Sequence, residues 1–367
     1  MKLGLIVNPL AGIGGRVGLK GSDGADTVSR ALQLGAEPTS PARAVEMLRA
    51  ISSMKQEVEL LTYPLEMGEL EAREAGFDPV VVGRVASGQT TAADTRRAAN
   101  ELASLGVDLL LFAGGDGTAR DILEAVGTSI PVLGIPAGVK MHSSVYAVSP
   151  RRAGELVRQH LISRAQTRDM EVMDVDEDQF RSGRVSARLY GYLRVPFERR
   201  LLQGAKALSA VSGEGLGGIA ARIVDGMDDD TCYILGPGST MKAVGDALQI
   251  DKTTLGVDVV CQGRMVVKDA SEAAILRAIE GRRARIVVTA IGGQGFIFGR
   301  GNQQISPRVI DQVGKKDILI VATQGKLLGL DGPLLVDTGD PECDRSLCGY
   351  VRVITGYDTI SIWEVSA

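Results

Sequence analysis

The chain has 367 residues, of which 44% are hydrophobic and 23% charged, and its formal net charge is −4. This is an ordinary globular composition, and the length favours two domains. Aromatic residues make up only 4% of a slightly acidic chain, which argues against a nucleic-acid-binding surface. No segment approaches the ~20 apolar residues of a membrane-spanning helix, and the first residues are too strand-like for a signal peptide. We therefore expect a cytoplasmic protein that does not bind membranes.

Cysteine and histidine are too few and too scattered for a zinc site. The only histidines are His142 and His160, and the cysteines, which include no CxxC pair, are Cys232, Cys261, Cys343 and Cys348. We expect these thiols to be reduced, as is usual in cytosolic proteins. Any metal should be a hard cation bound by carboxylates and phosphates, for which Mg²⁺ is the natural candidate.

Residues 1–150 alternate short apolar segments with amphipathic ones. The expected strands cover residues 3–8, 58–63, 79–83, 108–113 and 131–136. Between them we expect a helix that opens at Ser40, its N-cap, and another over 90–106 that is ended by Gly106. Unalternating apolar strands separated by helices predict a parallel sheet covered on both faces. Ligands bind beyond the carboxyl ends of such strands, which is where the glycine clusters fall.

From about residue 151 the pattern becomes strand-rich and mixed. Residues 169–197 alternate as a half-exposed antiparallel strand does, and residues 204–227 are glycine-rich and partly helical. Further strands are expected at RRARIVVTAIGG and KDILIVAT, and a closing hairpin at VRVITGY and TISIWEV. We therefore expect an α/β protein with domains at 1–150 and 151–367, with the option that the final strands return to the first lobe.

The strongest candidate site is the segment GGDGT. Gly114 and Gly115 allow a sharp turn that exposes backbone N–H groups, and Gly117 and Thr118 open a helix whose N-terminus attracts anions. An acid beside a phosphate repels it, unless the acid contacts Mg²⁺ through water or accepts a hydrogen bond from an attacking hydroxyl. Asp116 is thus the candidate catalytic residue and metal contact, and the alternative is a simple helix N-cap.

Two other glycine groups contain part of a dinucleotide-binding pattern. In NPLAGIGGR, Gly12 and Gly14 fit the fingerprint but Val17 replaces its third glycine, which leaves a phosphate loop braced by Asn8 or a plain surface loop. A complete G-x-G-x-x-G at residues 213–218 lacks a preceding strand, and we attribute it to chance.

Three later segments are weaker candidates. Gly238, Ser239 and Thr240 lie between a strand and a helix, where phosphate binding and helix capping are equally plausible. The expected substrate loop, within residues 292–304, contains Gly293, Gly295, Arg300 and Asn302. After the strand at 131–136, Gly138 and Lys140 are candidate phosphate contacts, whereas we expect His142 to serve packing or capping.

Gly114–Thr118 after an apolar strand resembles the signature shared by NAD kinases, diacylglycerol and sphingosine kinases, and phosphofructokinases. Asn8-Pro9 is similar to the opening motif of that superfamily. Thr90 and Thr91 lie where the lipid-kinase branch has a nucleotide-contacting threonine, and Gly238–Thr240 is similar to a dinucleotide-contacting segment of NAD kinases.

A larger set of motifs resembles the ATP-NAD kinase-like family, in the branch that includes the acetoin-catabolism protein X. These motifs, spread over nearly the whole chain, are VGLKGSDG, GGDGTARD, GVKMHS, SARLYGYLRVP, LGPGSTMKAVGDAL and GGQGFIFGRGNQQISP. The resemblance implies an N-terminal Rossmann-like lobe with a parallel sheet, a strand-rich α+β second lobe, and a nucleotide site between them. Because this family tends to assemble, it also implies a homo-oligomer.

The implied reaction is Mg²⁺-dependent phosphoryl transfer from ATP, or polyphosphate, to the adenosine ribose 2′-hydroxyl of NAD, giving NADP. Leu235-Gly236-Pro237 replaces a Thr-Pro-Thr of the family, and Gly138–His142 replaces the Gly-Thr-Gly-Asn-Asp loop of the lipid kinases. The Asn-Glu/Asp pair of standard NAD kinases is not evident. Two alternatives therefore stay open: a kinase of another hydroxyl acceptor such as a lipid or sugar, and a nucleotide- or NAD-binding accessory protein without turnover.

Overall fold

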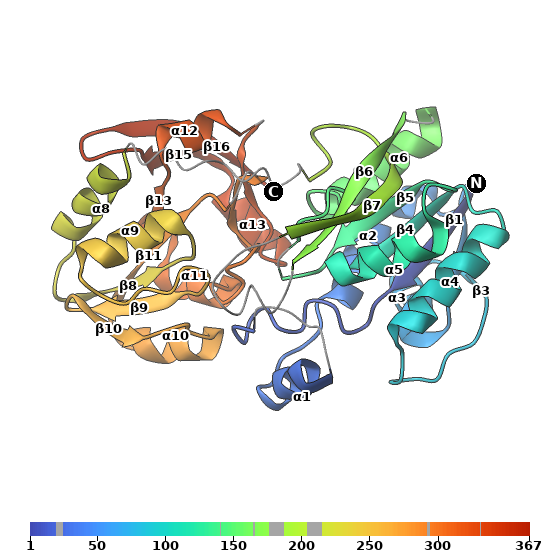
Figure 1. The fold of residues 1–367 in the computed structure, drawn as a ribbon, viewed down its shortest axis with the longest axis horizontal. Helices are drawn as coiled ribbons and strands as arrows, with labels where there is room; N and C mark the ends of the chain where they lie inside the picture. The colour runs from blue at the N-terminus through green and yellow to red at the C-terminus, as the bar shows by residue number, and fades with distance from the viewer. Residues whose placement is uncertain are drawn as a thin grey trace. The chain divides into compact units, whose positions relative to one another are not determined.

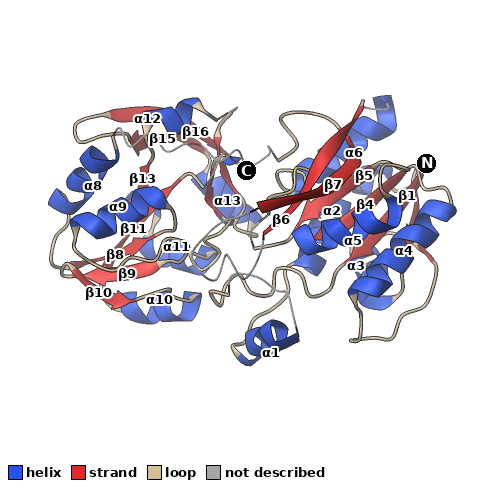
Figure 2. Ribbon diagram, in the orientation of Figure 1, coloured by secondary structure: helices blue, strands red, loops and turns tan. Residues whose placement is uncertain are grey.

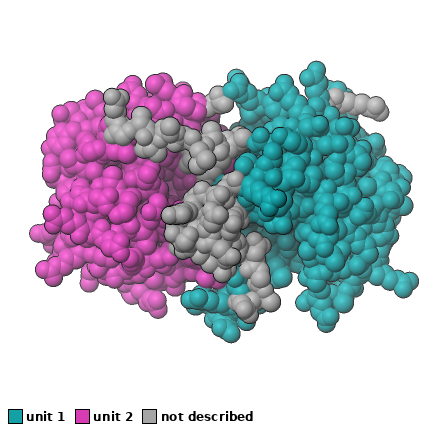
Figure 3. All heavy atoms as spheres, viewed as in Figure 1, with its two compact units in different colours: residues 1–14, 21–205 teal, residues 15–20, 206–367 magenta. Residues whose placement is uncertain are grey.

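The chain folds into two compact units in a computed structural model. The structure describes residues 1–19, 25–139, 141–163, 166–175, 187–203, 215–291, 294–330 and 332–367. Unit 1 consists of Met1–Gly14 and Gly21–Ala205, and unit 2 of Gly15–Lys20 and Lys206–Ala367 (Figure 3). This division differs from the expected one at residue 150, because about fifty further residues belong to unit 1 and a short N-terminal segment belongs to unit 2.

Unit 1 is built on a five-stranded parallel sheet with the order β3-β2-β1-β4-β5 (Figure 1). Its strands are β1 (Lys2–Val7), β2 (Glu59–Thr62), β3 (Val80–Val81), β4 (Leu109–Gly114) and β5 (Val132–Pro136). All residues of β4 and β5 are buried. The predicted parallel sheet, with its apolar strands buried in the core, is confirmed.

Helices pack in pairs on this sheet, α2 with α6 and α4 with α5. The helices of unit 1 are α1 (Ala25–Gln33), α2 (Ser40–Ala50), α3 (Glu69–Glu74), α4 (Ala92–Ser104), α5 (Asp116–Val126) and α6 (Pro150–Ser163), with short 3₁₀ turns η1 (Ser52–Met54) and η2 (Leu65–Met67). The predicted N-cap of α2 is wrong by one residue: the cap is Thr39, and Ser40 is the first helical residue. The N–H groups of both residues donate to the carbonyl of Ala11, which is the acceptor in place of a capping side chain.

An antiparallel pair, β6 (Thr167–Val175) and β7 (Ala187–Pro196), completes the described part of unit 1. The pair contacts α5 and β5, and its buried Val172, Leu193 and Val195 belong to the same apolar core as the parallel sheet. The antiparallel strand predicted within 169–197 is therefore confirmed.

Unit 2 contains a nine-stranded mixed sheet with the order β10-β9-β8-β11-β13-β15-β16-β14-β12 (Figure 2). Its strands are β8 (Thr231–Leu235), β9 (Asp258–Cys261), β10 (Arg264–Val267), β11 (Arg283–Thr289), β12 (Phe296–Phe298), β13 (Ile318–Val321), β14 (Leu334–Val336), β15 (Gly349–Ile354) and β16 (Ile360–Ser366). Strands β8, β11, β13 and β15 are parallel neighbours. Strands β15 and β16 form the predicted closing hairpin, and they belong to this unit.

Two apolar clusters line this sheet. One includes residues of α8 (Leu216–Asp225) and α9 (Ser239–Ala247). The other includes residues of α10 (Glu272–Ile279), α11 (Pro307–Val313), α12 (Gln324–Leu328) and α13 (Pro341–Leu347), and a 3₁₀ turn η4 (Lys315–Asp317) precedes β13. Within the described ranges, no helix is long and apolar enough to cross a membrane.

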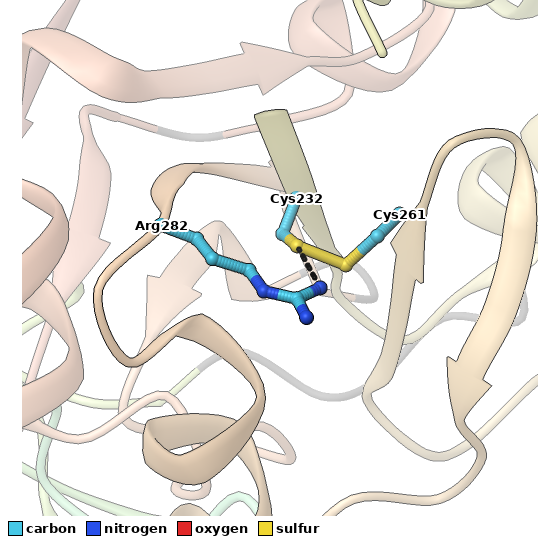
Figure 4. Close-up of a disulfide and its surroundings, with 3 residues drawn as sticks. All are labelled: Cys232, Cys261 and Arg282. Carbon is cyan, nitrogen blue, oxygen red and sulfur yellow. Dashed lines mark hydrogen bonds between the residues drawn. A yellow bond between two sulfur atoms is a disulfide. The ribbon is translucent and has the colours of Figure 1, made fainter. Parts of the chain in front are cut away.

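The expectation of reduced thiols is wrong for one pair of cysteines. Cys232 on β8 and Cys261 on β9 lie directly opposite each other in the antiparallel register, with their Cα atoms 4.4 Å apart, and form a disulfide (Figure 4). Arg282 donates to the Sγ of Cys232 over 3.9 Å. Cys343 and Cys348 are free and partly exposed. Cysteines separated by 29 residues are paired here by strand register, which the spacing alone does not reveal.

Candidate functional site

The carboxyl ends of β1, β4 and β5 bring three of the predicted segments of unit 1 together. At the end of β1, the backbone N–H of Asn8 donates to Ala113 O over 3.0 Å, and its side-chain amide donates to Thr118 Oγ1 over 2.9 Å. The side-chain oxygen of Asn8 accepts from Leu10 N over 3.2 Å. Asn8 therefore braces its own turn, as predicted, and ties that turn to the start of α5.

Several glycines at this edge are required by close packing. A Cβ on Gly114 would lie 2.3 Å from Thr118 Oγ1, and one on Gly138 would lie 2.9 Å from the Cα of Gly115. Gly12 has a φ of +79°, and a Cβ there would lie 2.0 Å from the hydroxyl oxygen of Thr39. The turns after β4 and β5 thus touch backbone to backbone. Gly14, which is buried, is the last residue of the first segment of unit 1.

Asp116 is the first residue of α5, and its carboxylate holds the segment that follows β5. Its Oδ2 accepts from the backbone N–H of His142 over 2.6 Å, and its Oδ1 accepts from that of Ser143 over 3.1 Å. The N-cap alternative is wrong, because Gly115 is the N-cap of α5. The imidazole Nδ1 of His142 lies 3.4 Å from Asp116 Oδ2, and both residues are buried.

The segment held by Asp116 is anchored on its other side as well. The hydroxyl of Ser143 donates to Met173 O over 2.8 Å and accepts from Met173 N over 3.0 Å. The amide of Gln203 donates to Met141 O over 3.2 Å. The carboxylate of Asp116 is consequently fixed in position by the fold before any ligand binds. The neighbouring candidate Lys140 lies outside the described residues.

Thr90 and Thr91 lie at the same edge of the sheet but after β3, with β2 and β1 between β3 and β4. Neighbouring strands are about 4.8 Å apart, so β3 lies roughly 14 Å across the sheet from β4, the strand that leads into the GGDGT turn. Thr91 is the N-cap of α4, and its N–H and hydroxyl both donate to Asp94 Oδ2 over 2.8 Å. These hydrogen bonds, led by that from the Thr91 hydroxyl, lower the pKa of Asp94.

In unit 2, the segment Gly238–Thr240 lies at the carboxyl end of β8. Gly238 is the N-cap of α9 with a φ of +113°, so a capping role for Ser239 is wrong. The N–H of Gly238 donates to Thr254 O over 2.7 Å, and a Cβ on this glycine would lie 3.2 Å from Thr289 Cγ2. Ser239 is exposed and Thr240 is buried.

Sequence reasoning missed Lys326, which reaches the same edge of unit 2. Its Nζ donates over 3.3 Å to Thr289 Oγ1, at the end of β11, and it follows β13 by five residues. Thr323 caps the short helix α12 by accepting from Lys326 N. Three parallel strands thus place a glycine turn, a hydroxyl and an amine close together. The sequence signal was Thr-x-Gly-Lys directly after an apolar strand.

The predicted substrate loop is built around buried side chains. Arg300 donates to Asp337 Oδ2 over 3.0 Å. The amide of Asn302 donates to Ile297 O over 2.8 Å, and its oxygen accepts from Gly299 N over 3.0 Å. These contacts shape the loop, and contact with a substrate stays a prediction. Gly295 has a φ of +79°, and Gly293 lies outside the described residues.

A magnesium ion would find one suitable donor at the edge of unit 1. Among the described residues, no group of three histidine, cysteine or acidic side chains is placed to hold a metal ion. Mg²⁺ in kinases needs no such cage, since it is bound through one or two carboxylates together with substrate phosphates and water. Each oxygen of Asp116 accepts one backbone hydrogen bond and can accept another from a metal-bound water. The site therefore fits an ion that arrives with the phosphates.

A Rossmann-like unit and a strand-rich unit, each with a glycine turn at the carboxyl ends of parallel strands, define a nucleotide-dependent α/β protein. Residues 3–164 match the model of the ATP-NAD kinase N-terminal domain, and residues 228–365 match that of the C-terminal domain. Together the matched ranges cover well over half of the chain, which belongs to the ATP-NAD kinase-like family. ATP is the phosphoryl donor in this family, whose implied ligands are ATP and NAD.

Solved structures that resemble the chain share little of its sequence. Two structures of a Bacillus anthracis str. Sterne protein, provisionally described as a diacylglycerol kinase, match with 15% and 16% identity and a TM-score of 0.26 each. Each match covers 48% of this chain, and the chain spans 42% and 45% of those proteins. Among curated proteins none matches.

Proposed function

We propose that the protein transfers the γ-phosphoryl group of ATP to the 2′-hydroxyl of the adenosine ribose of NAD, giving NADP and ADP. The observation that carries this proposal is the position of Asp116. Its carboxylate is fixed by two backbone N–H groups, beside a glycine turn at the carboxyl edge of a parallel sheet. That edge is where ligands bind in such sheets.

In this reaction the hydroxyl oxygen would bond to the γ-phosphorus while the bond from phosphorus to the β–γ bridging oxygen breaks. Asp116 would orient the hydroxyl and accept its proton. The backbone N–H groups of Gly114, Gly115, Gly117 and Thr118 would bind phosphate oxygens, because positioning and charge stabilisation dominate phosphoryl transfer. Mg²⁺, held by Asp116 through water, would supply further neutralisation of the phosphate charge.

The edge of the sheet of unit 2 is a second proposed anion site. Ser239 and Thr240 begin α9 after the glycine turn, and the amine of Lys326 lies at the end of the neighbouring strand. Gly238 with these three residues would contact phosphate groups of NAD. Asn8, Gly12, Gly14, Thr90, Thr91, Gly138 and Lys140 stay proposed nucleotide contacts, and Gly293, Gly295, Arg300 and Asn302 stay the proposed substrate loop.

A second candidate is a nucleotide- or NAD-binding accessory protein without turnover. It is favoured by the same carboxylate, since both oxygens of Asp116 already accept backbone hydrogen bonds and the residue has a sufficient structural role. A kinase of another hydroxyl acceptor would keep the chemistry of the GGDGT turn and change only the acceptor.

The direct test is to incubate the full chain with ATP, Mg²⁺ and NAD and to measure NADP with an NADP-specific dehydrogenase. Parallel reactions should replace ATP by polyphosphate, and NAD by diacylglycerol or a sugar. NADP formation that requires ATP supports the proposal. No product with any acceptor, together with calorimetric binding of ATP or NAD, would refute it and favour the accessory role.

A cytoplasmic location, a homo-oligomer and a link to acetoin catabolism complete the proposal. The location is supported by the expected substrates, ATP and NAD, which are abundant inside cells. The disulfide between Cys232 and Cys261 does not support it, because disulfides persist mainly in oxidising compartments. The acetoin link is supported by the branch resemblance alone. Light scattering coupled to size-exclusion chromatography measures the oligomer directly.

A further inference from the structure

Unit 2 contains a fully buried ion pair between α9 and β9. Lys252 is 2% exposed and Asp258 is 0% exposed, and the lysine Nζ lies 3.0 Å from Asp258 Oδ2. The same amine donates to the backbone carbonyls of Thr253 and Gly256, over 2.7 and 3.0 Å. Lys252 therefore holds the loop that joins α9 to β9 from the inside.

Asp258 holds the same loop from the start of β9. Its carboxylate accepts from Thr253 N over 2.7 Å, from Thr253 Oγ1 over 2.9 Å and from Asp269 N over 2.6 Å. Burial lowers the pKa of Lys252, and the Asp258 carboxylate opposes that shift. Replacing a buried ion pair by apolar residues is often neutral or stabilising, so net stability does not explain this pair.

The pair is connected to the Gly238–Thr240 turn at both ends of α9. At the start, Thr254, which follows the doubly held Thr253, accepts the N–H of Gly238 through its carbonyl over 2.7 Å. At the end, a Cβ on Gly245 would lie 2.3 Å from the Cβ of Lys252, so the helix packs directly on the lysine stem. The ion pair thus fixes the loop that fixes the turn.

We propose that Lys252 and Asp258 are positioning residues that hold the Gly238–Thr240 turn in the conformation that binds the phosphate groups of a dinucleotide. The inference rests on the proposed function. It assigns the contact with the dinucleotide to the edge of unit 2. Neither residue touches the ligand: both are buried, and their charged groups contact each other and the loop between α9 and β9.

A merely structural role would predict loss of stability and nothing else. Asp344 offers a matched control in the same unit, because it is buried and accepts from Thr338 N over 2.9 Å and from Thr338 Oγ1 over 2.7 Å. Both bonds end on Oδ1, which an asparagine would keep as its amide oxygen, so the control is Asp344→Ala, which removes the same kind of aspartate–threonine contact on α13. A double variant, Lys252→Met with Asp258→Leu, removes both charges and the bonds to Thr253 while keeping the site apolar and filled.

The experiment measures KM for NAD, KM for ATP, unfolding in urea, and amide hydrogen exchange at residues 238–240 in the full chain. We expect the double variant to stay folded, because no unpaired charge is left buried, and to lose some stability, because Thr253 N and Asp269 N lose their acceptor. We expect its KM for NAD to rise about ten- to hundredfold, as for a displaced binding group, with KM for ATP nearly unchanged. Amide exchange at Gly238 should accelerate. Asp344→Ala should lose stability and leave KM for NAD and this exchange rate unchanged.

Two results would overturn the inference. One is a double variant with wild-type KM for NAD and wild-type exchange at Gly238. The other is an equal rise of KM for NAD in Asp344→Ala, which would mean that the effect follows general destabilisation. Failure of the proposed function is recognised separately, because the wild-type chain then produces no NADP. In that event the inference fails if the double variant does not accelerate exchange at Gly238, or if it binds NAD in calorimetry as tightly as the wild type does.

Discussion

The contacts of Asp116 change what its substitution should do. On sequence grounds, Asp116→Asn should reduce kcat far more than stability. In the structure the two carboxylate oxygens accept one backbone N–H each, from His142 and Ser143. An asparagine can accept only one of these bonds, and its amide must face the other N–H. A buried N–H group that is left without an acceptor costs about 1–3 kcal/mol of folding free energy.

This cost is too small to account for a large loss of activity. A domain with about 5 kcal/mol of stability, the low end of the usual range, would retain about 2 kcal/mol and remain more than about 95% folded. Loss of a general base or of a hydroxyl-orienting group lowers kcat about 10²- to 10⁴-fold. We therefore expect Asp116→Asn to lose at least about 10² in kcat while staying folded.

The assay combines steady-state NADP formation with urea unfolding of the wild type, Asp116→Asn and Asp344→Ala. The last variant removes the Oδ1 that accepts from Thr338 N and Thr338 Oγ1 in unit 2, so it calibrates the stability loss of an unpaired donor without touching unit 1. If Asp116→Asn is destabilised as expected but keeps kcat within about threefold, a loss far below that of a missing general base, then Asp116 only holds the turn. The catalytic assignment is then wrong.

Three further changes test other features. Lys326→Met should raise KM for NAD about tenfold through loss of a charged hydrogen bond. The control is Lys242→Met, which removes a lysine that is bonded within α9 and should leave KM for NAD unchanged. Equal kinetics of the two variants would count against a phosphate contact of Lys326. Glu71 is buried, and burial raises its pKa to about 7. The native state therefore holds a proton that the unfolded state releases, so stability should fall as pH rises from about 4.5 to about 7, and Glu71→Gln should be more stable at pH 8 by at most about 3 kcal/mol. Urea unfolding at pH 5 and pH 8 measures this, and an equal gain at both pH values would contradict it. Gly138→Ala should lose about 1–3 kcal/mol and most activity, because its Cβ has no space, whereas Gly217→Ala, with nothing within 4 Å, should be neutral or stabilised in thermal unfolding.

The core of unit 1 was predictable because local patterns determine it. Leu109–Gly114 and Val132–Pro136 are continuous apolar segments, and such segments are buried on both faces of a parallel sheet. The glycine turns after these strands were predictable for the same reason, since they fall where the strands end. The hairpin of β15 and β16 followed from alternation and a short turn.

The remaining features depend on contacts between distant residues. Asp116 meets backbone groups 26 and 27 positions away, and no local rule distinguishes such a contact from a helix cap. Cys232 and Cys261 are paired by the register of two strands, and Lys326 reaches Thr289 across 37 positions. The burial of Lys252 was likewise not predictable, because a lysine in a polar loop sequence is usually exposed.

The short segment Gly15–Lys20 has a consequence for how the molecule can be divided. It belongs to unit 2, where Arg16 O accepts from Glu272 N over 3.0 Å at the start of α10 and Gly15 packs against Gln303. The chain therefore passes between the units three times, after residues 14, 20 and 205. A fragment that begins at residue 206 would lack a piece of its own fold, so the two units are not independent cassettes. Expression and domain-exchange experiments should therefore use the whole chain, so that Gly15–Lys20 stays with the rest of unit 2.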